Sequence, residues 1–188
     1  MTKTIHIVNA SFLDAGAMNH LGHVVEQRFN RPVELRNGSL DIAAALDQSR
    51  RQYSSTILLA KMLTHGIEES AKCIAVVDVD LYVPVLTFVF GEAQFNGSAA
   101  VVSLQRLTNQ FYGLPRNDNL MLSRLEKETV HELGHTLGLY HCRQFECVMR
   151  ASTYVEEIDL KRSELCTDCR LLLQQMGQAT SLHHTKLE

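Results

Sequence analysis

The chain has 188 residues, of which 45% are hydrophobic, so it is long enough for one domain with a substantial core. Its formal net charge of -3 and its scattered Lys and Arg residues argue against nucleic acid as a partner. No apolar run approaches the roughly 18 residues that a membrane span needs. Residues 1–10 lack the basic and apolar regions of a signal peptide. These features predict a monomeric globular protein of the cytoplasm, with neither nucleic acid nor a membrane as partner.

The first half of the chain alternates strand-like and helix-like patterns. Apolar or β-branched runs predict three strands, at residues 4–9, 32–36 and 73–79. The third run is apolar on both faces, which is typical of buried parallel strands. A capping-box pattern, Ser11-x-x-Asp14, predicts the start of a helix that continues to Phe29. Apolar residues at helical spacing predict a second helix over residues 47–65, ending at Gly66.

The pattern changes after the third strand. Residues 87–92 and 99–104 predict two further strands, and the short turn between them, around residues 95–97, implies antiparallel pairing. We therefore expect a mixed five-stranded sheet in an α/β (α+β) fold. After Asn117 we expect one helix through His135, an irregular stretch rich in cysteine, and a last helix over residues 159–175.

The string HELGHTLGLYH covers residues 131–141 and carries the clearest chemical signal. His131 and His135 are four residues apart, so on a helix they lie about 40° apart around the axis and about 6 Å apart along it. Both imidazoles can then reach one metal ion. Glu132 lies about 100° further around the helix. It occupies the general-base position of the H-E-x-x-H zinc motif, from which it can reach a water molecule on the ion.

His141 needs a break in this helix. On a continuous helix it would lie about 9 Å beyond His135, too far for a shared ion whose bonds to nitrogen are about 2 Å long. Gly138 can end the helix because glycine adopts the left-handed conformation of a helix terminus without steric cost. Three histidine ligands leave a fourth position open, as in catalytic zinc sites. A chance occurrence of H-E-x-x-H is disfavoured by the matching positions of Gly138 and His141.

Four of the five cysteines lie close together in the sequence, at positions 142, 147, 166 and 169. Their spacing, C-x4-C followed by C-x2-C, favours a zinc site over disulfides in a chain without a signal peptide. Four thiolates complete a tetrahedron, so this second zinc would be structural. Two alternatives are disulfides and a mixed cluster that recruits His141. Cys73 is interpreted as an ordinary buried strand residue.

These motifs resemble a known family. The H-E-x-x-H-x-x-G-x-x-H string followed by Met149 is the metzincin signature. The cysteines that flank it, with the stretches FVFGEA (residues 88–93) and AAVVSLQRL (residues 99–107), are similar to the archaemetzincins. The resemblance implies a zinc-dependent peptidase in which Met149 packs beneath the metal and an edge strand within residues 87–92 binds the substrate. It further implies a catalytic zinc on His131, His135 and His141, the general base Glu132, and a structural zinc on Cys142, Cys147, Cys166 and Cys169.

We therefore expect a metalloprotease with two zinc ions that hydrolyses peptide bonds, with Glu132 taking a proton from the zinc-activated water and delivering it to the leaving amine. A zinc-stabilised module that binds peptides with little or no hydrolysis is the alternative. Tyr154 is a candidate donor to the oxyanion and Tyr140 a weaker one, although packing roles are favoured for both. The single domain, residues 1–188, would comprise an upper subdomain (1–137) with the sheet and active-site helix, and a lower, zinc-stapled subdomain (138–188).

Overall fold

The structure is a computed structural model that describes residues 4–38, 40–64 and 71–184. A five-stranded sheet lies at its centre, with the strands in the order β2 (Val33–Asn37), β1 (Ile5–Ala10), β5 (Lys72–Val77), β8 (Ala99–Ser103) and β7 (Gly91–Ala93). The helices are α1 (Ala15–Phe29), α2 (Ser55–Thr64), α3 (Asp118–Thr136), α4 (Val155–Leu160) and α5 (Thr167–His184). Short 3-10 helices are η1 (Ala43–Ala45), η2 (Gln105–Leu107) and η3 (Asn109–Tyr112). A small second sheet contains β3 (Leu46–Asp47), β4 (Gln52–Ser54) and β6 (Leu81–Tyr82).

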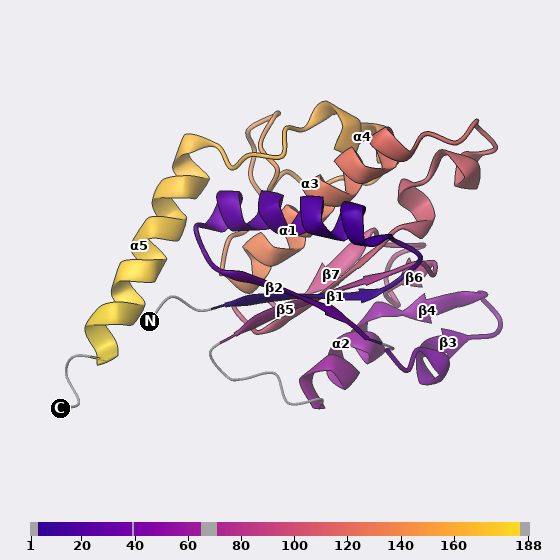
Figure 1. Ribbon diagram of the computed structural model, residues 1–188, viewed down its shortest axis with the longest axis horizontal. Helices are drawn as coiled ribbons and strands as arrows, with labels where there is room; N and C mark the ends of the chain where they lie inside the picture. The colour runs from indigo at the N-terminus through magenta and orange to yellow at the C-terminus, as the bar shows by residue number, and fades with distance from the viewer. Residues whose placement is uncertain (1–3, 39, 65–70, 185–188) are drawn as a thin grey trace.

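The main sheet is mixed, as the sequence predicts. β2, β1, β5 and β8 are mutually parallel, and β7 pairs antiparallel with β8 at the edge. Helices α1 and α3 cover one face of the sheet and α2 covers the other (Figure 1). β5 and β8 contribute buried side chains to both faces, which explains why their sequences are apolar throughout.

The edge strand is shorter than predicted. Of residues 87–92, only Gly91 and Glu92 belong to β7, while Val89 forms an isolated bridge to Leu81 of the small sheet. Further back along the chain, Arg50 donates hydrogen bonds to the carbonyls of Leu86 and Thr87, beside the small sheet. The paired edge therefore comprises three residues that lie beside α3.

Two predicted helix starts in the first half are wrong. α1 begins at Ala15, capped by the Asp14 carboxylate, because the Ser11 hydroxyl instead binds Asn9 in the preceding turn. The predicted helix over residues 47–65 begins only at Ser55. Before it, Asp47 accepts hydrogen bonds from the turn that follows, and β3 and β4 pair as a hairpin. The predicted stop at Gly66 lies outside the described residues.

The last predicted helix, over residues 159–175, is two helices. α4 ends at Leu160, Lys161 is extended, and α5 starts at Thr167 and continues to His184 along one side of the molecule (Figure 1). The interruption turns the chain so that Cys166 and Cys169 meet the other two clustered cysteines. Within the described part of the chain, every helix is too short or too polar to cross a membrane.

Candidate metal centre

Helix α3 carries the first two histidines of the candidate site. Its N-cap is Asn117, whose side chain accepts a hydrogen bond from the Leu120 N–H, and His131 and His135 occupy the last two turns of the helix. The helix ends at Thr136, and the predicted break follows at Gly138, where φ is +93°. The N–H of Gly138 donates to the carbonyl of His135, and the next N–H, of Leu139, donates to Gly134. This paired arrangement is the Schellman motif, and it reverses the chain directly after the helix.

The reversal brings His141 to the two helical histidines. The ring centroid of His141 lies 5.3 Å from that of His131 and 4.9 Å from that of His135. One potential ligand atom from each of the three rings lies within 4.8 Å of the others. His141 groups with these histidines and the cysteines form a separate cluster, so the arrangement does not support the mixed-cluster alternative.

The hydrogen bonds of the two helical histidines indicate their protonation. Nδ1 of His131 lies 2.8 Å from the carbonyl of Val148, and Nδ1 of His135 lies 2.7 Å from the carbonyl of Leu139. Since a carbonyl oxygen only accepts, both Nδ1 atoms donate and both neutral rings have a bare Nε2. These two Nε2 atoms face each other at 3.1 Å. Two lone pairs at that distance repel each other unless a cation lies between them, so the donor set fits zinc.

Removal from water favours the neutral form of the three histidines. It lowers the pKa of His131 well below its ordinary value, and it also lowers the pKa values of His135 and His141. The positive charge of Lys161 lowers all three pKa values further. Neutral imidazole is the form that ligates a metal, so at neutral pH the site needs no deprotonation before binding.

Glu132 is buried beside the histidines and next to the edge strand. Burial raises the pKa of its carboxyl group well above the ordinary value; the nearby Glu128 carboxylate also raises it and Lys161 opposes the rise. Gly91 of β7 lies against it, and a Cβ added there would lie 2.7 Å from Cγ of Glu132 and 2.7 Å from the carbonyl of Val101. Gly91 therefore allows the carboxyl group to lie against the strand.

Met149 is fully buried and its sulfur lies against Gly134 of α3. A Cβ at Gly134 would overlap its sulfur, so the glycine between the two helical histidines makes room for it. Tyr140 and Tyr154, for which packing roles were favoured, are instead 74% and 67% exposed. Tyr140 stacks on Phe95, with ring centroids 4.4 Å apart.

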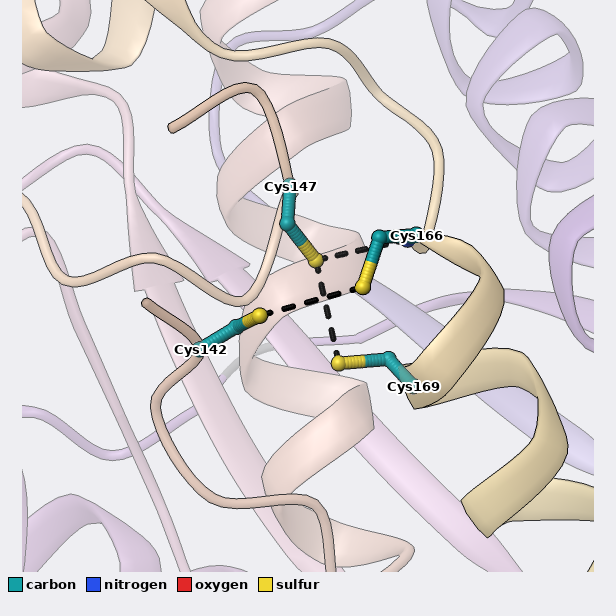
Figure 2. A group of neighbouring side chains, drawn as sticks. All are labelled: Cys142, Cys147, Cys166 and Cys169. Carbon is teal, nitrogen blue, oxygen red and sulfur yellow. Dashed lines mark hydrogen bonds between the residues drawn. The ribbon is translucent and has the colours of Figure 1, made fainter. Parts of the chain in front are cut away.

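The four clustered cysteines meet as a second group (Figure 2). Sγ of Cys142 lies 3.8 Å from Sγ of Cys166, and the same distance separates Cys147 from Cys169. Disulfide sulfurs are about 2.05 Å apart, so the described thiols are not bridged. The N–H groups of Gln144 and Cys166 point at the sulfurs of Cys142 and Cys147, and such donors stabilise thiolates. The cluster fits a closed, four-thiolate zinc site.

Comparison with known proteins identifies the family. The family model described as peptidase family M54 matches residues 44–175. The archaemetzincin of Methanocaldococcus jannaschii is 42% identical over 133 residues, which are 71% of this chain and 72% of that protein. This chain belongs to peptidase family M54, the archaemetzincins. The archaemetzincin of Thermococcus kodakarensis is 40% identical over 185 residues, covering 93% of this chain and 97% of that one.

The fold of this archaemetzincin agrees with solved structures. The crystal structure of a zinc-dependent peptidase from Methanocorpusculum labreanum superposes with a TM-score of 0.81 at 29% identity, covering 90% of this chain and 99% of that one. The comparisons therefore confirm the predicted fold class and the membership in a metallopeptidase family. The roles of the individual site residues stay predictions.

Three residues near the site were not identified from the sequence. They are Gly91, Glu128 and Lys161. Gly91 lies inside the FVFGEA stretch that carries part of the resemblance, which is the one signal that pointed towards it. Glu128 and Lys161 are 33 positions apart and had no signal, because their importance comes from a contact that only the fold creates.

Proposed function

We propose that this archaemetzincin hydrolyses peptide bonds with Glu132 as the proton-transferring group beside a zinc ion on His131, His135 and His141. The observation that carries the proposal is the pair of bare, facing Nε2 atoms with a third imidazole beside them. Three neutral donors leave one side of the ion open to water or substrate.

Zinc, when bound, supplies a Lewis acid that polarises a carbonyl group and lowers the pKa of water. The residues of the chain orient the metal ligands and transfer the proton. The carbonyls of Val148 and Leu139 orient two of the imidazoles. Burial raises the pKa of the Glu132 carboxyl group well above its ordinary value, so its carboxylate is a stronger base that can accept a proton from water and then pass it to the leaving amine.

Strand β7 supports a peptide as the substrate. It lies at the edge of the sheet and its middle residue, Glu92, is paired with Val101 of β8. The backbone groups of Gly91 and Ala93 alternate with those of Glu92 and therefore face away from β8. An extended peptide could add to this edge as a further strand next to Glu132. A protein or peptide substrate, a monomeric state and a cytoplasmic location remain our predictions.

The second part of the proposal is a structural zinc on Cys142, Cys147, Cys166 and Cys169, giving two zinc ions per chain. The closed set of thiols supports this role, because four thiolates leave no position for substrate. Cys142 directly follows His141, so the two groups of ligands share one short segment of chain.

The alternative is a zinc-stabilised module that binds peptides with little or no hydrolysis. The buried Glu132 argues against this alternative. Burying an ionisable group costs free energy, and peptide binding alone gives no reason for that cost. No such group is needed for holding a peptide on the edge of a sheet.

The test is hydrolysis of a mixed peptide library by zinc-loaded wild type and by Glu132→Gln, followed by mass spectrometry and elemental analysis. We expect cleavage by wild type only, with two zinc ions in both proteins. Glu126→Gln is the matched control, since Glu126 lies on the same helix but pairs with His20. Equal cleavage by Glu132→Gln would refute its role. If the fully loaded wild type cleaves nothing yet retains peptides, the binding module is the better description.

A further inference from the structure

Lys161 is a buried lysine behind the candidate zinc site. Its side chain is 0% exposed, and Nζ donates to Oε1 of Glu128 at 2.9 Å and to the carbonyl of Arg150 at 3.1 Å. Lysine is almost never fully buried unless it is paired. Well-packed apolar residues often stabilise a core as much as a buried ion pair does. Stability of the fold alone therefore does not call for a lysine at this position.

The first partner of Lys161 belongs to the turn around Met149. Three consecutive carbonyls of this turn each accept a hydrogen bond from a different part of the site. The pairs are Val148 with Nδ1 of His131, Met149 with the N–H of Cys142, and Arg150 with Nζ of Lys161. The turn is thus held by a histidine of one candidate metal site, by a cysteine of the other, and by Lys161.

The second partner of Lys161 belongs to helix α3. Glu128 is four residues before Glu132, so the two carboxyl groups lie on the same face of the helix, one turn apart. The side chain of Glu128 is 5% exposed, and Lys161 neutralises it. One ammonium group therefore links the helix that carries Glu132 to the turn that orients the His131 ring.

We propose that Lys161 is a positioning residue, which holds the Val148–Arg150 turn against α3 and thereby fixes the His131 imidazole relative to Glu132. This inference rests on the proposed function, which gives the position of the His131 ring relative to Glu132 its catalytic importance. Loss of a group that orients a metal ligand, as the Val148 carbonyl orients His131, typically changes metal affinity or activity by about 10–100-fold. Lys161 itself contacts neither the substrate nor the metal in this scheme.

Lys127 provides a matched control. It is also a buried lysine, 9% exposed, and it also links α3 to the region of α4. Its Nζ donates to the carbonyls of Ile158 and Asp159 at 3.0 and 3.2 Å, at the end of α4, and so it holds a different part of the chain. Lys127→Met and Lys161→Met each remove one buried ammonium, and only the second removes the donor to the turn.

The first experiment measures how fast zinc leaves the zinc-loaded proteins in excess chelator. Loss from the histidine site is identified as the phase that is missing in His141→Ala. We expect this phase to be about tenfold faster or more in Lys161→Met and within about twofold of wild type in Lys127→Met. If both variants lose this zinc at the wild-type rate, Lys161 does not position the site. Peptide hydrolysis should follow the same order, with kcat lowered and KM nearly unchanged.

The second experiment separates positioning from simple charge neutralisation. Lys161→Met leaves the Glu128 carboxylate buried and unpaired, which destabilises the fold by itself. In Lys161→Met/Glu128→Leu that charge is gone, so stability should recover while zinc loss stays fast. Recovery of the wild-type zinc-loss rate in the double variant would overturn the proposal. Zinc loss needs no substrate, so a wild type that cleaves no peptide would refute the proposed function and still leave Lys161 testable.

Discussion

At the scale of single residues, Gly91 is a position where the edge strand lies against the Glu132 side chain. We predict that Gly91→Ala lowers kcat/KM at least about tenfold, because the added Cβ displaces Glu132 and small displacements at a reacting centre are costly. The carbonyl of Val101 on the other side belongs to the backbone and cannot rotate away. Overpacking of this kind should also cost about 1–3 kcal/mol of stability, measurable by urea unfolding.

Gly16→Ala is the control for this prediction. The nearest atom to a Cβ at Gly16 is a side-chain oxygen of Asp14, at 3.2 Å, which can adjust. Wild-type turnover in Gly91→Ala together with an unchanged urea midpoint would mean that the strand and Glu132 are further apart than the structure has them.

The residues of the site differ in how far the sequence reveals them. His131, Glu132 and His135 follow from helical periodicity, which is local and therefore visible in a short string. His141 needs one further step, the left-handed glycine at position 138, and the structure has that turn. Gly91 and Lys161 cannot be identified from a short string of sequence, because their contacts join segments that are far apart in the chain.

At the scale of elements, the four cysteines determine the path of the chain after α3. We predict that Cys169→Ser, which removes one thiolate from the first turn of α5, lowers the zinc content by one ion per chain. Because binding of a structural zinc contributes directly to folding, the melting temperature should fall by about 5 °C or more. Elemental analysis and differential scanning calorimetry would measure these two effects.

Cys73→Ala is the control, since burial raises the pKa of the Cys73 thiol to about 11 and its strand lies on the sheet, away from the cluster. This variant should keep two zinc ions. Limited proteolysis should cleave the Cys169→Ser protein after Cys142 and leave the sheet intact. An unaltered zinc content in Cys169→Ser would mean that the thiols do not form a metal site.

The elements that sequence reasoning misplaced share a physical cause. Of residues 47–54 only Tyr53 is in helical register with the apolar residues of α2, and the Asp47 carboxylate satisfies the N–H groups of Ser49 and Arg50 and so favours a turn. The break between α4 and α5 has a similar origin, since Lys161 turns inward to Glu128. Strands β5 and β8 were easier to predict, because burial on both faces leaves an apolar run in the sequence.

At the scale of the whole molecule, the histidines and Glu132 make stability depend on pH in opposite ways once the histidine site has been emptied by a mild chelator. The pKa values of His131, His135 and His141 are lowered in the folded chain, so below about pH 6.5 the unfolded chain binds protons that the folded chain does not. Their contribution to stability is present above that pH and is lost as the pH falls.

The contribution of Glu132 to stability changes with pH in the opposite direction. Its pKa is raised by burial, so the folded chain holds a proton that the unfolded chain releases above about pH 4.5, and this contribution is lost as the pH rises. Acidification from pH 7 to 5.5 therefore weakens the fold through the histidines while Glu132 partly offsets the loss. We predict that the melting temperature of Glu132→Gln falls more steeply over this range than that of wild type, because glutamine does not titrate.

The measurement is thermal unfolding of both proteins at half-unit pH steps, with the four-cysteine zinc still bound. Asp118→Asn, altered at an exposed carboxylate of α3 that pairs with Arg116, should follow the wild-type curve, because arginine keeps its charge over this pH range. Parallel curves for wild type and Glu132→Gln would mean that Glu132 is not held as a buried acid before metal binds. A steeper fall of the melting temperature in Glu132→Gln would mean that Glu132 takes up a proton because it is buried between α3 and β7. Gly91 makes this packing possible.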